Sequence, residues 1–406
     1  MNLVNEINFC EVCDNSYLES VLNLGNHPLC DDLVQVGDSR VCPEYPIEIL
    51  YCNRCETAHQ RFQVPKQDLF PKSYHYRSRF TVDVLNGMSA LVDATERHLG
   101  SLTGKLVLDV GCNDGSLLDF FQKKGAKTVG IEPTDAYRDG LGKGHDIING
   151  FFTTQSASEI RSIHGAPDVI TFTNVFAHIE NLPNVIEALK ILMSSSTMIV
   201  VENHYLGSVL RLNQFDTFYH EHPRTYSLTS FSYIAKSLGI ELKAVEFPSR
   251  YGGNIRVFMG ASSFNRNSDI ADIKVILEKE AQFGLRIKEL HNWIARWQTE
   301  TRIRIDNLVE TNGKLSAKAF PGRAAILVKL LGLDSDSIET TYEKPGSMKI
   351  GHYLPGTRIP IESDDKLFLR MQKLEVILNL AWHIPKEIEN YLKENNFRGR
   401  IVHVIG

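Results

Sequence analysis

Apolar residues recur along the chain in two different patterns. Short apolar runs, four or five residues long, predict buried strands. These strands are expected at Leu106–Val110, Thr128–Ile131, Val169–Phe172, Thr197–Val201 and Ile255–Met259. In segment 81–99 the apolar positions fall three or four residues apart, which is typical of an amphipathic helix. Strands that alternate with helices predict a mostly parallel sheet covered on both faces.

The flanking segments follow other patterns. Residues 1–72 are loop-rich and contain several prolines. Residues 270–310 are dense in Glu, Lys, Arg, Leu and Ile and contain no proline, which predicts a long helix or a helical hairpin. A second alternating set follows from Leu315. We therefore expect an α/β protein with three parts: a small module at 1–72, a Rossmann-like domain at 73–265, and a second α/β domain at 266–406 that begins with the long helix.

Composition narrows the class of protein. The 406 residues are 43% hydrophobic and 23% charged, which is typical of a soluble protein with more than one domain. The formal net charge of -5 indicates no general attraction to nucleic acid. The first residues do not resemble a signal peptide, and no run reaches the roughly 20 apolar residues of a membrane helix. We expect a cytoplasmic protein with neither a nucleic acid nor a membrane as partner.

Six of the seven cysteines precede residue 56, and four of them form two C-x-x-C pairs, Cys10 with Cys13 and Cys52 with Cys55. Two such pairs can complete the tetrahedron of a structural zinc, with no position left for water. The insertion between the pairs exceeds the roughly 15–20 residues usual in zinc ribbons, but loop-closure entropy grows only slowly with length. A redox dithiol is the alternative. The pattern favours one structural zinc.

The strand at 106–110 leads into a glycine turn and a helix at 116–124, and the next strand ends at Glu132. A carboxylate at that place can accept hydrogen bonds from ribose hydroxyls. The spacing D-x-G-x-x-x-G differs from G-x-G-x-x-G, so a nicotinamide dinucleotide is disfavoured. An ordinary strand–turn–helix corner is the alternative. The turn resembles the S-adenosylmethionine (SAM) site of class I methyltransferases. The candidate cofactor-binding residues here are Asp109, Gly111, Asn113, Asp114, Gly115 and Glu132.

Polar groups also follow the later strands. Asn174 and His178 come after the strand at 169–172, at a sheet edge where ligands bind in open α/β sheets. Asn174 is the stronger cofactor candidate, whereas His178 could equally be a capping or surface residue. The run from Tyr219 to His222 suits a loop over a cleft, where histidine is the natural base near neutral pH. A solvated polar loop is the alternative reading of that run.

These pieces, in this order, resemble the zinc-containing sugar C-methyltransferases that act on nucleotide-linked keto-deoxysugars, such as the C-3 methyltransferase of tetronitrose biosynthesis. The likeness extends over nearly the whole chain. Besides the two cysteine pairs, it takes in residues 24–29, 111–115, 132–133, 151–152, 174–178, 219–222, 252–256 and 355–360.

The resemblance implies SAM as cofactor, with Phe152 beside it, and an NDP-4-keto-6-deoxysugar as substrate. It assigns the general base to His222 and places Tyr219 and His178 near the keto oxygen, where hydrogen bonds would stabilise an enolate. It also makes Glu221 an orienting or substrate-contacting acid. It further makes Tyr76 an active-site tyrosine and places Tyr74 and Arg256 at the substrate. The family also implies a monomer.

In the same family the C-terminal domain holds the nucleotide diphosphate with a glycine-rich turn, G-x-G-A-T-x-K. Here the aligned stretch, 317–323, lacks most of the glycines and ends in Arg323, which can bind a phosphate as a fork. Lys349 and His352 are further candidates. Two other functions stay open: an O- or N-methyltransferase on another small molecule, and a zinc-ribbon nucleic-acid-binding protein with a degenerate methyltransferase fold, which the acidic charge disfavours.

Overall fold

The computed structural model describes residues 4–70, 77–80, 82–261 and 270–405. The chain forms two compact units. The first contains Met1–Val21, Ile49–Gln214 and Glu221–Arg286, and the second contains Leu22–Glu48, Phe215–His220 and Ile287–Gly406. The insertion between the cysteine pairs thus groups with the C-terminal part of the chain. The three-domain boundaries expected from the sequence stay a prediction.

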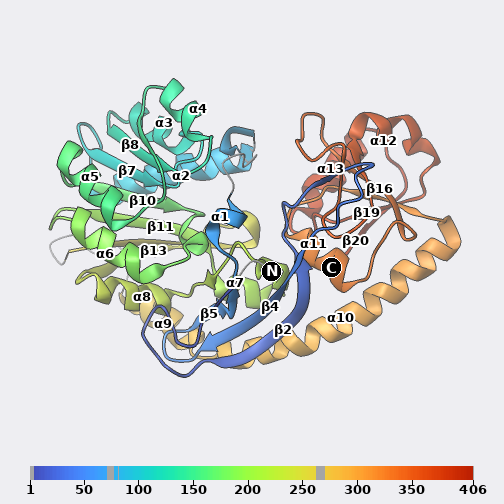
Figure 1. The fold of residues 1–406 in the computed structure, drawn as a ribbon, viewed down its shortest axis with the longest axis horizontal. Helices are drawn as coiled ribbons and strands as arrows, with labels where there is room; N and C mark the ends of the chain where they lie inside the picture. Colours follow the sequence, from blue (N-terminus) through green and yellow to red (C-terminus); the bar gives the residue numbers. More distant parts are fainter. Residues whose placement is uncertain (1–3, 71–76, 81, 262–269, 406) are drawn as a thin grey trace. The chain divides into compact units, whose positions relative to one another are not determined.

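A seven-stranded sheet with the order β13-β14-β11-β10-β7-β8-β9 forms the centre of the first unit (Figure 1). Its strands are β7 (Leu106–Val110), β8 (Lys127–Glu132), β9 (Asp146–Asn149), β10 (Val169–Thr173), β11 (Met198–His204), β13 (Glu241–Glu246) and β14 (Asn254–Gly260). The strands β7 to β11 are parallel, and β14 runs antiparallel to both of its neighbours. The chain order reverses between β7 and β10, so the carboxyl ends of these strands flank the place where α/β sheets bind ligands.

Helices cover both faces of this sheet. The first face packs on α2 (Val82–Leu99) and α3 (Ser116–Lys123). The opposite face packs on α5 (Thr154–His164), α6 (Leu182–Leu192) and α8 (Leu228–Ser237). Successive strand residues point to opposite faces: Val107 joins the first core and Leu108 the second. The short helices α4 (Tyr137–Gly142) and α7 (Leu206–Arg211) follow β8 and β11.

The second cysteine pair lies at the end of β4 and in the turn to β5 of a separate small sheet with the order β12-β5-β4-β2, whereas the first pair precedes β2 in the chain. Its strands are β2 (Glu19–Pro28), β4 (Glu44–Cys52), β5 (Thr57–Gln60) and β12 (Arg224–Thr225). The other short elements of the first unit are β1 (Asn5–Glu6), β6 (Phe62–Gln63), α1 (Lys66–Leu69) and the 3-10 helices η1 (Ser78–Phe80), η2 (Phe176–His178) and η4 (Arg250–Gly252), whereas η3 (Phe215–Thr217) belongs to the second unit. Strand β12 begins two residues after His222, so the chain passes from the Tyr219–His222 run into the cysteine-bearing sheet.

The charged segment forms two helices, α9 (Ile270–Glu280) and α10 (Phe283–Asn312), with a break at residues 281–282. Within the described parts of the chain, no helix combines the length and the apolar character needed to cross a membrane.

The second unit is built on a parallel five-stranded sheet with the order β18-β16-β15-β19-β20. Its strands are β15 (Leu315–Lys318), β16 (Ile338–Glu343), β18 (Ile361–Ser363), β19 (Val376–Asn379) and β20 (Arg400–His403), with a separate pair formed by β3 (Val34–Gln35) and β17 (His352–Tyr353). Its helices are α11 (Ala324–Leu330), α12 (Asp364–Arg370), α13 (Pro385–Glu394) and η5 (Met371–Lys373). The chain order reverses between β15 and β19, which marks a second ligand-binding edge. The α/β class expected for both regions is confirmed.

Candidate active site and zinc centre

The four cysteines of the two C-x-x-C pairs converge, and their sulfur atoms all lie within 4.8 Å of one another. The sulfurs of Cys10 and Cys55 are 3.4 Å apart, and those of Cys13 and Cys52 are 3.6 Å apart. All four are free thiols rather than disulfides. A tetrahedral zinc with Zn–S bonds of about 2.3 Å sets its sulfurs about 3.8 Å apart. The cluster therefore fits one zinc ion.

Polar groups surround these sulfurs. The Nε2 atom of His59 lies 3.3 Å from the sulfur of Cys10, and the Thr57 hydroxyl lies 3.0 Å from that of Cys55. The Asn15 side-chain amide donates to the sulfur of Cys52 at 3.4 Å. Such hydrogen bonds orient metal ligands and stabilise the negative charge of thiolates.

The predicted cofactor turn has two residues with left-handed backbone that suit glycine, Gly111 with φ of 72° and Gly115 with φ of 74°. A Cβ atom on Gly111 would lie 2.6 Å from Cγ2 of Val175, so the turn packs directly against the end of β10. Asp109, at the end of β7, is buried and accepts a hydrogen bond of 2.7 Å from the Thr171 hydroxyl. Burial raises the pKa of Asp109 to about 7.

Glu132 ends β8, as predicted, and its carboxylate is already oriented. Oε2 accepts from the backbone N–H of Asn113 at 3.0 Å, and Oε1 accepts from the N–H and the hydroxyl of Thr134 at 2.9 and 2.6 Å. A carboxylate has about four acceptor positions, so these contacts leave one for a further donor. The group therefore has room for one ribose hydroxyl, whereas the sequence suggested contacts with both hydroxyls of a ribose.

Asn113 and Asp114 connect the turn to η1. The side-chain oxygen of Asn113 accepts from the N–H of Ser78 at 3.1 Å, and the Asp114 carboxylate accepts from the N–H of Arg79 at 3.0 Å. Asp114 also accepts from the Ser116 hydroxyl at 2.6 Å. These side chains dock the 78–80 segment on the turn, a role that the spacing of residues did not reveal.

Asn174 has a left-handed backbone with φ of 54° at the end of β10, and its side-chain oxygen accepts from Asn254 at 3.2 Å. Asn254 also donates to the buried carboxylate of Glu202 at 3.1 Å. Phe152 packs edge-to-face on Phe172, with ring centroids 5.9 Å apart. Two candidates for the cofactor pocket, Asn174 and Phe152, are thus fixed at the carboxyl edge of the sheet.

Arg256 is placed differently from its expected contact with substrate. It is 3% exposed, and its guanidinium is 2.7 Å from Glu202 and 2.8 Å from Glu246. The strand register sets Glu202 directly opposite Arg256. Because both sides of the fork are engaged by carboxylates, the geometry gives Arg256 a structural role in the sheet.

Three histidines meet near the carboxyl ends of β10 and β11. The ring of His222 lies 4.8 Å from that of His178 and 5.2 Å from that of His204, measured between centroids. His178 Nδ1 donates to the carbonyl of Glu221 at 2.7 Å. Burial lowers the pKa of His178 to about 4, although carbonyl contacts oppose this shift. His178 is therefore neutral at pH 7 with its hydrogen on Nδ1, and its Nε2 is a hydrogen-bond acceptor.

In the tautomer whose Nδ1–H donates to the Glu221 carbonyl, Nε2 of His178 accepts hydrogen bonds. The contact with an enolate oxygen that was expected for His178 stays a prediction. His204 was not among the predicted site residues. Its position at the end of β11 carries the same signal that identified Asn174, a polar residue at the end of a buried strand.

The other residues predicted for the active site belong to different units or lie outside the described residues. Glu221 and His222 are buried in the first unit, whereas Tyr219 is half-buried in the second. Tyr74 and Tyr76 lie outside the described residues.

In the second unit, the turn after β15 carries Arg323 at the switch between β15 and β19. Arg323 is 8% exposed, forms an ion pair of 3.0 Å with Asp216, and lies 5.3 Å from the ring centroid of Trp382. Its Nη2 atom and Nδ1 of His383 are buried and have no hydrogen-bond partner within the described residues. Asp216 thus holds one side of the fork.

The two remaining candidates for nucleotide binding in this unit, Lys349 and His352, make different contacts. Lys349 donates from Nζ to the carbonyl of Phe320 at 2.8 Å, within the Arg323 turn. His352 instead belongs to β17, opposite Gln35 of β3.

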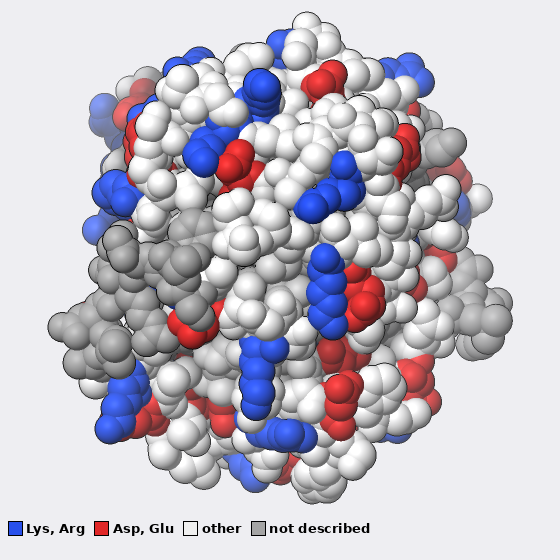
Figure 2. Space-filling model, turned by 90° about the vertical axis from the view of Figure 1, so that its left-hand side faces the viewer, with Lys and Arg blue, Asp and Glu red and all other residues white. Residues whose placement is uncertain are grey.

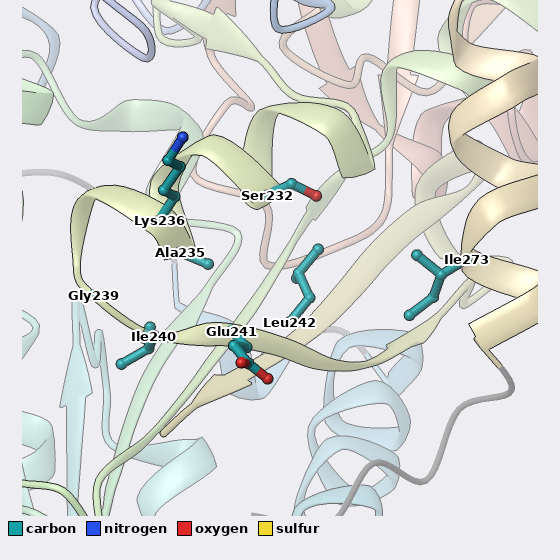
Figure 3. Close-up of a pocket in the computed structure, with 8 residues that line it drawn as sticks. All are labelled: Ser232, Ala235, Lys236, Gly239, Ile240, Glu241, Leu242 and Ile273. Carbon is teal, nitrogen blue, oxygen red and sulfur yellow. The ribbon is translucent and has the colours of Figure 1, made fainter. Parts of the chain in front are cut away.

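A cavity of about 440 Å³ lies elsewhere in the first unit, between α8, β13 and α9 (Figure 3). It is lined by Ser232, Ala235, Lys236, Gly239, Ile240, Glu241, Leu242 and Ile273. This set contains neither the glycine turn nor the histidines, so the cavity is separate from the candidate active site. On the face drawn in Figure 2, basic and acidic side chains are interspersed and form no single basic field.

Three family models match the chain in sequence order. "Putative zinc binding domain" matches residues 10–70, "Methyltransferase domain" matches residues 84–245, and "C-methyltransferase C-terminal domain" matches residues 249–405. These matches follow the cysteine cluster, the seven-stranded sheet and the second parallel sheet.

The chain is also similar to individual proteins. C-methyltransferase NovU of Streptomyces niveus is 28% identical over 402 residues, covering 97% of this chain and 94% of NovU. The ubiquinone biosynthesis O-methyltransferase of Shewanella halifaxensis (strain HAW-EB4) is 34% identical over 93 residues, 22% of this chain and 39% of that enzyme. Among solved structures, magnesium protoporphyrin IX methyltransferase (ChlM) from Synechocystis PCC 6803 with bound SAH has a TM-score of 0.36 at 16% identity, covering 44% of this chain and 83% of that chain.

The family matches and the geometry of the described residues both support SAM as cofactor and one structural zinc ion. The glycine turn and Glu132 fit the nucleoside of SAM, and the four thiols fit one zinc ion that leaves no position for water. Three family matches in order and a match to NovU over nearly its whole length support a SAM-dependent C-methyltransferase with a zinc-binding N-terminal module.

Proposed function

We propose that the acceptor is a nucleotide-linked 4-keto-6-deoxysugar and that methylation takes place at its C-3 carbon. A C-methyltransferase needs a carbon nucleophile, and a C–H bond next to a carbonyl group is acidic enough to supply one. The observation that carries this proposal is the cluster of His178, His204 and His222 beside the cofactor edge of the sheet. Histidine is the side chain best suited to accept such a proton near pH 7.

In this mechanism His222 removes the C-3 proton, and the electron pair of that C–H bond forms an enolate whose charge rests largely on the C-4 oxygen. SAM supplies an electrophilic methyl group. Neutral His178 orients the His222 ring, since its Nε2 can only accept a hydrogen bond. Tyr219 is the candidate donor to the enolate oxygen, as the family resemblance implies. Glu221 supports the base through its backbone carbonyl, which fixes the tautomer of His178.

The second unit is the proposed holder of the nucleotide diphosphate. Its parallel sheet has a switch point between β15 and β19, where nucleotides bind in folds of this kind. The free Nη2 position of Arg323 lies in that turn, and guanidinium groups bind phosphate oxygens strongly. An anionic ligand would also satisfy Nδ1 of His383 once that nitrogen carried a proton. We also propose a cytoplasmic location, since cysteines are kept reduced there and the four thiols of the cluster are free.

Isothermal titration against S-adenosylhomocysteine (SAH) and the diphosphates of thymidine, uridine, guanosine and cytidine tests both parts. We expect tight binding of SAH and of one nucleotide diphosphate. The His222→Ala variant should bind both as the unaltered protein does, while its turnover falls by roughly 10²–10⁴-fold. Binding of SAH without any response to a nucleotide would contradict the proposed acceptor and favour O- or N-methylation of another small molecule.

A further inference from the structure

Arg224 is completely buried, with an exposed fraction of 0%. A buried charge is strongly destabilising unless it is paired and hydrogen-bonded. The guanidinium meets this requirement with four partners. Nη1 donates to the Glu11 carboxylate and to the carbonyl of Glu180, Nη2 donates to the carbonyl of Ile179, and Nε donates to the Tyr226 hydroxyl at 2.9 Å. Glu11 and Tyr226 together keep the pKa of Arg224 above its ordinary value despite burial.

These partners belong to two different parts of the first unit. Glu11 follows Cys10 directly, so it is part of the first cysteine pair. Ile179 and Glu180 follow His178 directly, so their carbonyls fix the segment that carries this histidine. One buried side chain therefore connects a zinc ligand with a member of the histidine cluster.

The backbone forms a second connection between the same parts. Strand β12 pairs with β5, which begins two residues after Cys55, and Arg224 lies opposite His59. The N–H of Gln60 donates to the carbonyl of Pro223 at 2.8 Å, and Pro223 follows His222 directly. Both histidines are thus attached to the cysteine-bearing sheet, His178 through the Arg224 side chain and His222 through the start of β12.

We propose that Arg224 is a positioning residue through which the zinc centre holds His178 and His222 in their mutual arrangement. This inference rests on the proposed role of His222 as the base. It gives the zinc a part in catalysis without any contact with substrate: the metal fixes Glu11, Glu11 fixes Arg224, and Arg224 fixes the carbonyls that follow His178. Arginine suits this position because its planar fork has five donors and here reaches four acceptors, whereas a lysine ammonium has three donors.

The test compares Arg224→Lys with a matched control, Arg61→Lys. Arg61 lies in the same module but forms an exposed ion pair of 2.7 Å with Glu6. We expect Arg224→Lys to retain one zinc per chain and to bind SAH within about twofold of the unaltered protein. Its kcat should fall by about tenfold or more with little change in the KM for SAM, because small displacements of a base have large effects on rate. Arg61→Lys should behave as the unaltered protein.

Histidine ring NMR supplies a readout that a general loss of stability would not reproduce. In Arg224→Lys the ring signals of His178 and His222, assigned with His→Gln variants, should move, whereas that of His145, which binds Thr128 and Asp119 instead, should stay. Unchanged rings with unchanged kcat would overturn the proposal. A parallel loss of zinc, SAH binding and kcat would also overturn it, because Arg224 would then serve folding alone. If Arg224→Lys does not fold, Glu11→Gln replaces it, since this change keeps the acceptor oxygen and removes the charge.

The ring signals need no acceptor substrate, so the two proposals can fail separately. Shifted rings in Arg224→Lys, together with no methyl transfer to any keto-deoxysugar by the unaltered protein, would overturn the proposed acceptor and leave the coupling in place. Unshifted rings together with normal methyl transfer by the unaltered protein would overturn the coupling alone.

Discussion

Replacing Gly111 by alanine tests the cofactor turn at its tightest point. Gly111 has φ of 72°, where an L-residue is destabilised by about 1–2 kcal/mol. The new Cβ would lie 2.6 Å from Cγ2 and 2.8 Å from Cγ1 of Val175, a clash of the kind that costs about 1–3 kcal/mol in a packed core. We therefore expect Gly111→Ala to lower the free energy of unfolding by about 2–5 kcal/mol.

The clash would also reach the cofactor. Val175 follows Asn174, so a displaced Val175 moves the end of β10 away from the turn. We expect the affinity for SAH, measured by titration calorimetry, to fall by about tenfold or more, which corresponds to about 1.4 kcal/mol. Denaturant unfolding monitored by circular dichroism gives the stability change in the same preparation.

Two further variants separate the contributions. Val175→Ala removes both γ carbons, so the double variant should recover the steric part, about 1–3 kcal/mol, but not the backbone part. Gly142→Ala is the matched control, because a Cβ there meets nothing within 4 Å. If Gly111→Ala bound SAH as the unaltered protein does, or if Val175→Ala gave no recovery, the assignment of the turn and its packing would be refuted.

Two other changes have defined outcomes. Cys52→Ser should lower zinc below one per chain, as measured by plasma mass spectrometry, and reduce the melting temperature; retention of a full zinc would refute the four-cysteine site. Burial lowers the pKa of His220 to about 4, whereas an unfolded chain has about 6.5. The unfolded chain therefore takes up a proton first as the pH falls, and this group removes about 2 kcal/mol of stability between pH 7 and pH 5. His220→Gln should reduce that loss in denaturant titrations, and equal pH slopes for both proteins would contradict the assignment.

The strands that could be predicted from sequence are those buried on both faces. The run Leu106–Val110 is apolar except for Asp109 because helices cover it from both sides, and its predicted bounds agree with β7. Strand β13 escaped prediction because it is an edge strand with charged residues among its apolar ones, and β9 because it is short and half-exposed. The break between α9 and α10 also has no proline or glycine to announce it.

Some residues of the candidate site could be predicted from the sequence and others could not. Cysteine spacing and the glycine turn have local signatures, so both could be predicted, and the cofactor and the zinc are confirmed. Arg224 and Asn254 have no local sequence signature, because their roles depend on hydrogen-bond partners far away in the chain. The family resemblance placed Arg256 at the substrate, but strand register pairs it with Glu202. The monomeric state, the cytoplasmic location and the contacts of Tyr74 and Tyr76 stay predictions.

The most direct test of the central claim is the NMR spectrum of the product made with SAM labelled by ¹³C in its methyl group, using as acceptor the keto-deoxysugar of whichever nucleotide binds in calorimetry. Our account predicts a labelled methyl group bonded to carbon, together with loss of the C-3 hydrogen of the sugar. A labelled methyl group bonded to oxygen or nitrogen, or an acceptor left unchanged, would contradict it.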